Sequence, residues 1–275
     1  MKAALKKAQQ KGATNIVWGT VGTESSGVDV ATGKAYQCGQ VAANSQAAVN
    51  LAVSQSANPV SNLTATPQKL DVYKIARDIT VLVDGYGNAS GVMIAKADQT
   101  YYVLTSKHAV EKIATYTVTV QGGKKYSVAY DRIRQLADLD LAILPISSDQ
   151  SYPIANLGDS DRVKQGDNVY VSGWPGTEQA ITKRTHLVTD GRIVGLQKGD
   201  GDGYELMYGN STAPGMSGGP VLDTSGRLVG IHGRAAGNQV SGKVGINLGI
   251  PINLFLQMAS KSGLNLQKLG LRSGI

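Results

Sequence analysis

The stretch ITVLVDGYGNASGVMIAKADQTYYVLTS, residues 79–106, decides the fold class of this chain. It contains short runs rich in β-branched and aromatic residues at 79–83, 91–96 and 101–106. Turn-forming Asp, Gly and Asn residues separate the first two runs, as is typical of strands joined by short connections. The sequence therefore predicts consecutive β-strands in this region.

Similar runs continue towards the C-terminus, with turn residues between them and no intervening helical pattern. Such a succession predicts an all-β fold, either a sandwich or a pair of barrels. We expect helices only at the two ends of this region, at 70–77 and 251–261. The further predicted strands are 116–120, 126–130, 141–146, 168–173, 186–196, 204–208, 219–223, 228–233 and 244–250.

The first 68 residues have a different composition, rich in Ala, Gln, Ser, Asn and Gly and poor in aromatic residues. Residues 2–11 and 40–56 have helical potential, and the segment SANPVSNLTATPQ at 56–68 is typical of a linker. We therefore predict a poorly structured N-terminal extension or linker of unknown role at 1–68. The folded domain is predicted to span 69–275.

The composition excludes several classes of protein. The single cysteine, Cys38, cannot form an internal disulfide, so a disulfide-stapled scaffold is excluded. The net charge is +7, but Lys and Arg are scattered rather than gathered in a stripe, so we expect no nucleic-acid partner. No apolar run reaches the length of a transmembrane helix, so we expect no membrane partner.

The two ends of the sequence give weaker indications. The basic start MKAALKKAQQKG has no apolar stretch after it, so a secretory signal either was never present or has been removed. The residues after Lys261 are too few for another domain, so we expect no further module there.

The strongest chemical signal is GMSGGP at 215–220, which places Ser217 in a glycine-rich turn before a predicted strand. Acyl transfer by serine needs a hydroxyl on a tight turn, with backbone N–H groups aimed at the developing oxyanion. Glycine before the serine permits the backbone geometry that turns an N–H group inward. Glycine-rich serine turns also occur by chance, so this motif alone leaves the chemistry open.

Two further motifs supply the partners that such a serine needs. In YVLTSKHAV a strand ends and presents His108, and imidazole is a base that titrates near neutrality. In DLDLAIL at 138–144, a carboxylate precedes an apolar strand and would orient the imidazole. Asp138 and Asp140 would face the same way on a strand; we choose Asp140, directly before the apolar run. The chain has three histidines, His108, His186 and His232. We interpret His186 as a structural residue within a strand.

Together, LTSKHAV, DLAIL and GMSGGPV resemble the three active-site signatures of the trypsin/chymotrypsin-like serine proteases of bacterial type, in the same chain order. The resemblance implies two six-stranded antiparallel β-barrels, at about 78–150 and 151–250, with the active site between them. It implies a serine endopeptidase that works through an acyl-enzyme, with His108, Asp140 and Ser217 as catalytic residues. The oxyanion hole would be the backbone N–H groups of Gly215 and Ser217.

Some residues depart from this family. Met216 stands where animal trypsins carry Asp directly before the serine, so we predict no activation by that ion pair. Lys107 replaces the usual small residue before the base, which leaves the surroundings of His108 open. Ser211 stands six positions before Ser217, where trypsin has an Asp, so a substrate Lys or Arg would find no partner.

The pocket residues instead resemble those of bacterial glutamyl endopeptidases, through Thr212 and His232. A hydroxyl and an imidazole N–H can compensate a substrate carboxylate that has lost its water, which predicts cleavage after Glu. Gln, small and apolar residues remain alternatives. The backbone at Gly233 and Arg234 is predicted to pair with the extended substrate as an added strand.

The alternative to an active enzyme is a catalytically silent binding protein on the same fold. We expect no cofactor and no metal, because the DGDG sequence at 200–203 lacks the further ligands of a calcium loop and is interpreted as a turn. The expected partners are protein or peptide substrates, and we expect a monomer that is secreted or periplasmic.

Overall fold

The computed structural model describes residues 15–19, 32–36 and 71–271, except for 178–181, 200, 237–244, 262–264 and 269–270. The chain divides into two compact units, Met1–Thr64 and Ala65–Ile275. In the first unit, strands β1 (Asn15–Gly19) and β2 (Thr32–Tyr36) form an antiparallel pair. The predicted helices at 2–11 and 40–56 lie outside the described residues. The expected division at residue 68 remains a prediction.

The first half of the second unit is a seven-stranded antiparallel sheet, in the order β7-β6-β3-β4-β5-β9-β8. Short 3-10 turns, η1 (Lys107–Ala109) and η2 (Tyr130–Arg132), follow β5 and β7. The strands are β3 (Thr80–Asp84), β4 (Asn88–Ala97), β5 (Thr100–Ser106), β6 (Thr115–Thr119), β7 (Lys125–Ala129), β8 (Arg134–Gln135) and β9 (Leu141–Ser147).

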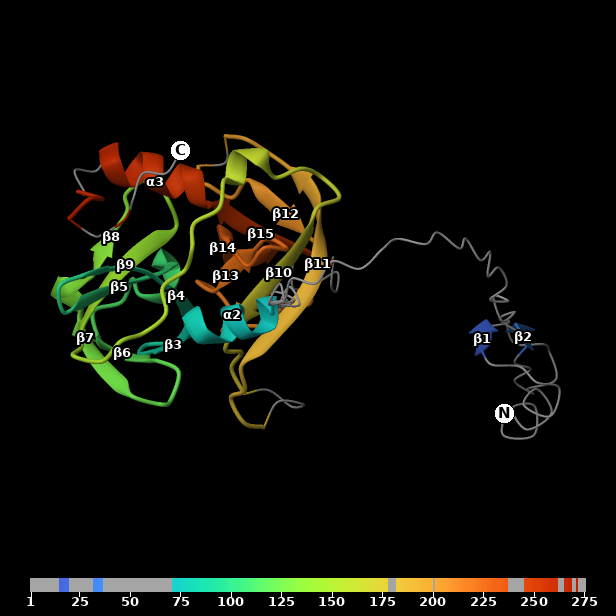
Figure 1. Ribbon diagram of the computed structural model, residues 1–275, viewed down its shortest axis with the longest axis horizontal. Coiled ribbons are helices and arrows are strands. Elements are labelled where there is room, and N and C mark those ends of the chain that lie inside the picture. Colours follow the sequence, from blue (N-terminus) through green and yellow to red (C-terminus); the bar gives the residue numbers. More distant parts are fainter. Residues whose placement is uncertain are drawn as a thin grey trace, which may run out of the picture. The chain divides into compact units, whose positions relative to one another are not determined.

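The second half is a closed barrel in the order β10-β11-β12-β15-β14-β13 (Figure 1). A 3-10 turn, η3 (Ser160–Arg162), precedes it. Its strands are β10 (Asn168–Gly173), β11 (Leu187–Leu196), β12 (Leu206–Tyr208), β13 (Pro220–Leu222), β14 (Leu228–Ala236) and β15 (Ile246–Pro251).

The predicted all-β architecture is confirmed, with one difference between the two barrels. The second barrel has the expected six strands and is closed, whereas the first is a seven-stranded sheet that remains open between β7 and β8. The physical reason lies in β8, which pairs with β9 over only two residues, Arg134 and Gln135. The chain then bends through 137–140 before β9 begins, so no long strand is left to close the sheet.

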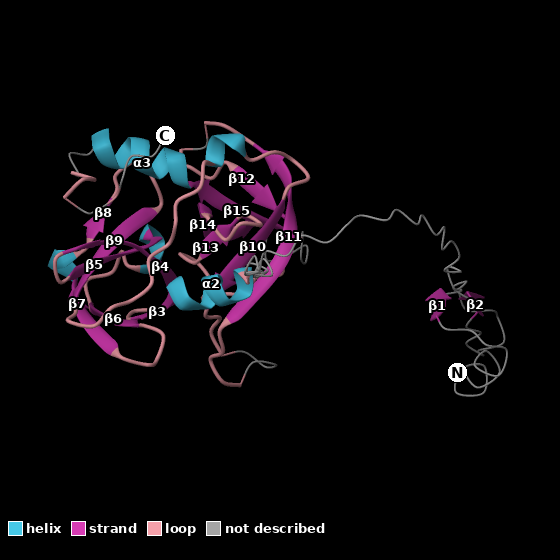
Figure 2. Ribbon diagram, viewed as in Figure 1, coloured by secondary structure: helices cyan, strands magenta, loops and turns pink. Residues whose placement is uncertain are grey.

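The two predicted helices are present and pack on the second barrel (Figure 2). Asp71 is the N-cap of helix α2 (Val72–Ile79). Its side chain accepts a hydrogen bond from the backbone N–H of Lys74 and so caps the first turn. Helix α3 (Ile252–Lys261) contacts β14 and β15 and buries Phe255 completely. No helix among the described residues is long and apolar enough to cross a membrane.

One hydrophobic cluster joins the two barrels. It contains Ile94 and Leu141 from the first sheet, and Ile231 and Ile250 from the closed barrel, together with Phe255 of α3. Each fully buried side chain of this size contributes about 1.5–3 kcal/mol relative to exposure. The barrels therefore dock through a shared apolar core, and this core fixes the position of residues that come from opposite barrels.

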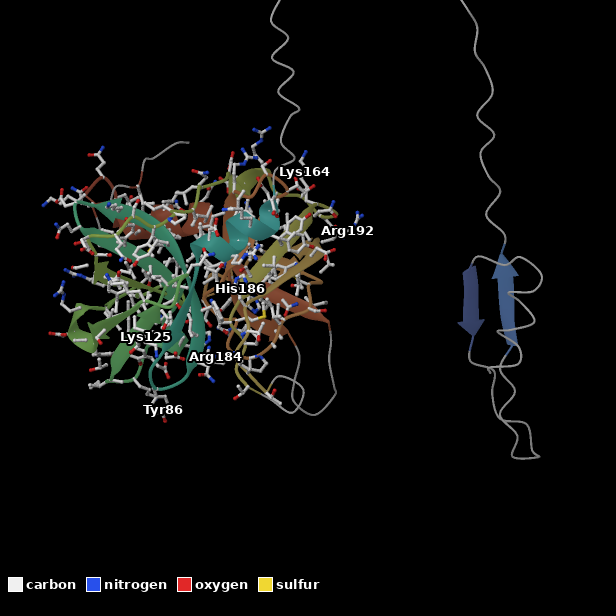
Figure 3. The ribbon with its side chains drawn as sticks, turned by 60° about the horizontal axis from the view of Figure 1, so that its bottom comes forward. Tyr86, Lys125, Lys164, Arg184, His186 and Arg192 are labelled. Carbon is white, nitrogen blue, oxygen red and sulfur yellow. The ribbon has the colours of Figure 1, made fainter. Side chains whose placement is uncertain are left out.

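Basic side chains lie on different parts of the described domain. Lys125 and Arg192 lie on opposite sides of the view in Figure 3. Arg184, in the same view, lies at the junction of the barrels: its guanidinium contacts Asp84 and Asn88 of the first sheet and the backbone of Trp174. At least part of the positive charge thus serves contacts within the protein.

Candidate active site

His108 and Asp140 meet because of the register between β5 and β9. Ser106, the last residue of β5, pairs with Leu141, the first residue of β9, so the residues just beyond this pair lie side by side. The Nδ1 atom of His108 lies 2.6 Å from Oδ2 of Asp140. The backbone N–H of His108 donates to Oδ1 of the same carboxylate at 2.8 Å. Both carboxylate oxygens are thus engaged by one residue.

The structure separates the two candidate aspartates. Asp140 is buried, with 4% of its surface exposed, whereas Asp138 is exposed. Residues 137–140 form bends rather than a strand, so the alternation that would turn both side chains the same way does not apply, and the choice of Asp140 stays a prediction. Lys107 helps to hold this bend, since its Nζ donates to the carbonyls of Leu136 and Ala137 at 3.1 and 3.3 Å. The amine of Lys107 is thus engaged by these two carbonyls.

The environment of Asp140 favours its charged form. Burial raises the pKa of Asp140, but hydrogen bonds from His108 and from the hydroxyl of Tyr204 outweigh it and hold the pKa below its ordinary value. The Tyr204 hydroxyl lies 2.5 Å from Oδ2. Asp140 is therefore ionised at neutral pH and can stabilise a positive charge on the imidazole of His108.

Ser217 lies in a turn whose backbone favours glycine at positions 215 and 218. Gly215 and Gly218 have φ angles of +96° and +88°, in the left-handed region. A Cβ atom on Gly218 would lie 2.1 Å from the carbonyl oxygen of Ser90. The hydroxyl of Ser217 donates to the carbonyl of Gly233 at 2.6 Å. No hydrogen bond between Ser217 and His108 occurs among the contacts of the described residues.

A short series of contacts places Ser217 near the His108–Asp140 pair. Its Oγ bonds to the carbonyl of Gly233, and a Cβ on Gly233 would lie 2.1 Å from the Tyr204 hydroxyl. That hydroxyl in turn contacts Asp140. Because the Gly233 contact is a single hydrogen bond, rotation about the Cα–Cβ bond of Ser217 is enough to release its Oγ.

Two backbone N–H groups of the serine turn are available for an anion. Gly176 donates its N–H to the carbonyl of Pro214 at 2.8 Å. Because the peptide between Pro214 and Gly215 is planar and trans, the N–H of Gly215 points the opposite way. In the described part of the chain, the N–H groups of Gly215 and Ser217 donate to no other group. Such a pair of donors suits a developing oxyanion.

Ser90 of the first barrel holds this turn, and the sequence analysis missed it. Its hydroxyl donates to the carbonyl of Gly215 at 2.8 Å and accepts the N–H of Trp174 at 2.7 Å. Its own N–H donates to the carbonyl of Ser217 at 2.8 Å. Ser90 is completely buried, so these bonds are shielded from water. A serine within a strand gave no signal of this role.

His232 lies in the interior beside Tyr208. Its Nδ1 is 2.7 Å from the Tyr208 hydroxyl. Burial, with a smaller effect of the His108 charge, lowers the pKa of His232 to about 4, so the ring is neutral at pH 7. The hydroxyl of Thr212 donates to Asn247 at 2.5 Å, and Ser211 is exposed.

His186 is partly buried in a polar network, and it lies just before β11 and not within a strand as expected. Its Nε2 lies 2.8 Å from the hydroxyl of Ser172, which also bonds to Thr80 of the first barrel. Burial, with a smaller effect of Arg77, lowers its pKa to about 4. These contacts support its structural interpretation.

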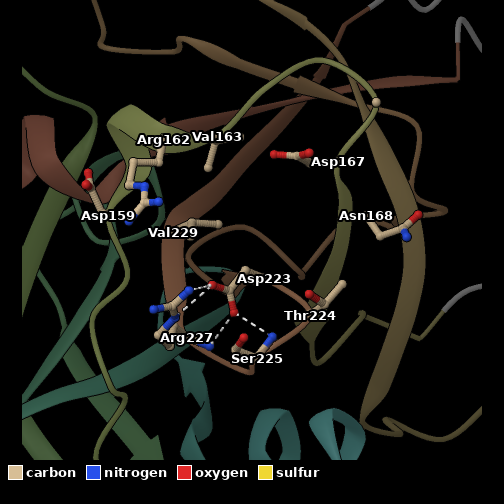
Figure 4. Close-up of a pocket in the computed structure, with 11 residues that line it drawn as sticks. Asp159, Arg162, Val163, Asp167, Asn168, Asp223, Thr224, Ser225, Arg227 and Val229 are labelled. Atoms are coloured by element: carbon tan, nitrogen blue, oxygen red, sulfur yellow. Dashed lines mark hydrogen bonds and ion pairs between the residues drawn. The ribbon is translucent and has the colours of Figure 1, made fainter.

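Two cavities can be compared. One, of about 400 Å³, is lined by residues around the base, including His108, Asp140 and Arg234. The other, of about 490 Å³, lies away from them and is polar (Figure 4). There Asp223 is already engaged by Arg227 and by the backbone of Ser225. The first cavity therefore is the one that adjoins the reactive groups.

Comparison with known proteins agrees with this geometry. Residues 89–231, more than half of the chain, match the family model described as the trypsin-like peptidase domain. The chain belongs to the trypsin-like peptidase family. The matched segment runs from β4 to β14 and so contains His108, Asp140 and Ser217.

The particular relatives are of HtrA type. "Serine protease Do-like HtrA" of Bacillus subtilis is 31% identical over 150 residues, 53% of this chain and 33% of the relative. "Serine protease Do-like HtrB" of the same organism is 31% identical over 175 residues, 60% of this chain and 36% of the relative. The chain thus spans about a third of the length of these curated relatives.

A solved structure has the same fold. The HtrA-type protease AlgW with tripeptide aligns at a TM-score of 0.57 and 25% identity, covering 71% of this chain and 63% of that one.

A probable periplasmic serine endoprotease of DegP-like type from Chlamydia pneumoniae is 31% identical over 150 residues, covering 54% of this chain and 30% of the relative.

Proposed function

We propose that this chain is a serine endopeptidase, with Ser217 as nucleophile, His108 as base and Asp140 as its orienting carboxylate. The observation that carries the proposal is the part-buried Asp140–His108 hydrogen bond beside a serine turn with two unengaged N–H groups. The family and its serine protease relatives support the same activity. The absence of a Ser217–His108 bond means that the serine must rotate before reaction.

The proposed reaction has two balanced steps. Oγ of Ser217 attacks the peptide carbonyl carbon while its proton passes to Nε2 of His108. The oxyanion that forms accepts hydrogen bonds from the backbone N–H groups of Gly215 and Ser217. The C–N bond then breaks as His108 returns the proton to the leaving amine. A water molecule hydrolyses the acyl-enzyme with the same base.

The substrate is proposed to be an extended protein or peptide chain. Strand β13 pairs with β14 through Pro220–Leu222 and Leu228–Ile231, whereas β14 continues to Ala236. The backbone at Gly233 and Arg234 therefore offers an edge to which a further strand can add. The relative AlgW has a structure with tripeptide, which agrees with peptide substrates. We propose that the protein acts as a monomer, without nucleic acid or membrane.

For the substrate residue before the scissile bond, the sequence pattern indicates Glu, and Gln is the second candidate. A neutral His232 supplies one uncharged donor, and the Thr212 hydroxyl is engaged by Asn247. Because a desolvated carboxylate needs more compensation than an amide, these two observations favour Gln. The net positive charge favours the approach of acidic substrates.

We propose a secreted or periplasmic location, in line with the periplasmic location named for the DegP-like relatives. The alternative function is a catalytically silent binding protein on the same fold. It has no support beyond the missing Ser217–His108 bond.

The experiment that tests the activity is labelling with a fluorophosphonate probe. Wild-type protein should be labelled, and Ser217→Ala should not. Folded wild-type protein that takes up no label would contradict the proposal and favour the silent binding protein. A set of peptides that differ only in Glu, Gln or Ala before the scissile bond then tests the pocket. Equal cleavage after all three would end the Glu and Gln proposals.

A further inference from the structure

A segment of the second barrel forms hydrogen bonds to Asp140, the proposed orienting carboxylate of the first barrel. The chain just before β12 brings two groups to Asp140. The carbonyl of Asp202 accepts the N–H of Asp140 at 3.1 Å, and the hydroxyl of Tyr204 donates to Oδ2 at 2.5 Å. Both the backbone and the side chain of Asp140 are thus bonded to a segment that lies more than 60 positions later in the sequence.

The hydroxyl of Tyr204 competes for the same oxygen as His108. Oδ1 of Asp140 accepts only the backbone N–H of His108 among the described contacts, whereas Oδ2 accepts both the His108 ring and Tyr204. The other charged group that faces this carboxylate is the guanidinium of Arg234, at 3.8 Å from Oδ2. Tyr204 therefore supplies a second hydrogen-bond donor to Oδ2, beside the His108 ring, from a segment of the other barrel.

Tyr204 is itself held firmly. It is 1% exposed, and the guanidinium of Arg234 lies over its ring at 4.2 Å from the centroid. Arg234 is oriented in turn by Asp202 at 2.6 Å. Burial and the Asp140 charge raise the pKa of Tyr204 above its ordinary value, so the phenol remains protonated and donating.

Gly233 completes the arrangement. A Cβ atom there would lie 2.1 Å from both Cε1 and the hydroxyl oxygen of Tyr204. The φ angle of Gly233 is outside the left-handed region, so its backbone conformation does not require glycine. The space that a side chain at 233 would fill is already occupied by Tyr204.

We propose that Tyr204 is a positioning residue, which holds Asp140 in the geometry that orients His108, and that Gly233 lacks a side chain to make room for it. The proposal rests on the proposed function, because it assigns a role in the same reaction. Without the Tyr204 hydroxyl, the carboxylate has one donor fewer and holds the ring proton of His108 more strongly. The imidazole then needs a higher pH to be free as a base.

The first test is Tyr204→Phe, which removes the hydroxyl and keeps the ring under Arg234. We expect kcat to fall about ten- to a hundredfold, the range for a hydrogen bond to a charged group, with KM unchanged. The acidic limb of the kcat/KM profile should move to higher pH. Tyr101→Phe is the matched control, because its hydroxyl is also buried but bonds to Gln150 and Tyr152 in the first barrel. It should leave kcat and the profile unchanged.

A second test uses the fit between Tyr204 and position 233. Gly233→Ser should abolish most activity by collision with Tyr204. In the double variant Tyr204→Ala with Gly233→Ser, the collision is gone and the new hydroxyl lies beside Asp140. The double variant should therefore be more active than either single variant. A double variant no better than Gly233→Ser, in protein shown to be folded by circular dichroism, contradicts the proposal.

A third measurement does not depend on turnover. The low-field proton resonance of the His108–Asp140 hydrogen bond should shift in Tyr204→Phe and stay in place in Tyr101→Phe. An unchanged resonance together with a wild-type kcat overturns the role of Tyr204. Failure of the proposed function has a different signature, namely wild-type protein that is not labelled by fluorophosphonate while the resonance still responds to Tyr204→Phe.

Discussion

The two barrels contribute to the site in different ways. The first, an open sheet, carries His108 and Asp140 as an already formed hydrogen-bonded pair. The second, a closed barrel, carries Ser217 on a turn whose flanking glycines have left-handed backbone. Adjacent strand ends are enough to form the pair, whereas the nucleophile turn needs glycine and close neighbours. The proposed base is therefore positioned by strand register, and the proposed nucleophile by a backbone conformation that glycine adopts readily.

Each barrel also holds the reactive group of the other. Ser90 of the first barrel fixes the carbonyl of Gly215, and Tyr204 of the second barrel bonds to Asp140. The apolar cluster that spans both barrels keeps these contacts in place. The site is therefore organised only when the barrels are docked, and damage to either barrel should disturb both halves of the machinery.

The largest expected effect comes from the charge in the first barrel. Asp140→Asn removes the carboxylate that faces His108, and kcat should fall by about 10⁴. Asp138→Asn is the matched control, since Asp138 is exposed and only two positions away. Steady-state kinetics on one peptide substrate measures both. Equal activity in the two variants would show that the carboxylate–imidazole pair of the first barrel does not serve the serine of the second.

A smaller effect is expected at the contact from the first barrel to the second. Ser90→Ala leaves the carbonyl of Gly215 and the N–H of Trp174 buried without this partner. The loss should destabilise the fold by about 1–3 kcal/mol, and kcat should fall about tenfold or more because the oxyanion donors loosen.

Ser160→Ala is a control for the Ser90 variant, since Ser160 is also buried and bonds to the backbone of Asn253, away from the site. It should lose stability without loss of kcat. Denaturant unfolding and steady-state kinetics separate the two effects. If Ser90→Ala loses stability but keeps its kcat, the first barrel does not position the turn.

A third effect concerns acid and is measured as the stability of the fold. His186 and His232, in the second half, have pKa values lowered to about 4 in the folded protein, against the ordinary value of 6.5. The unfolded chain therefore binds more protons between these pH values. Stability should be full above about pH 6.5 and fall as the pH approaches 4, by up to about 1.4 kcal/mol per pH unit for each histidine.

Urea unfolding across this range measures the slope, and His186→Gln should make it shallower. Both histidines lie in the second half, so the acid sensitivity that they cause should originate there. A stability that is flat between pH 4 and 6.5 would contradict the lowered pKa values of these two histidines.

Much of the fold was readable from local pattern. The strands around 79–106 and the helices near 70–77 and 251–261 were predicted because alternation and turn residues act over a few positions. The predicted strand begins at 141, as β9 does, but the pattern did not show that 137–140 form bends that leave Asp138 exposed and Asp140 buried. Short-range preference gives no account of a bend whose hydrogen bonds come from Lys107 and from the second barrel.

The site divides in the same way. His108, Asp140 and Ser217 could be proposed from the sequence because each lies in a motif whose chemistry is recognisable over a few residues. Ser90 and Tyr204 were missed, since serine and tyrosine within or beside strands are common and their partners lie 125 and 64 positions away in the chain. Only contacts across the barrels distinguish them from ordinary core residues.

By itself, the sequence determined the all-β class, the glycine turn at Ser217 and the residue types needed for nucleophile, base and carboxylate. These depend on backbone preference and side-chain chemistry, which act locally. The tertiary structure decided which aspartate is buried, which N–H groups stay unengaged, and why position 233 must be glycine. Those outcomes depend on which surfaces meet when the two barrels dock, because hydrogen bonds and steric exclusion act between atoms that are close in space, however distant they are along the chain.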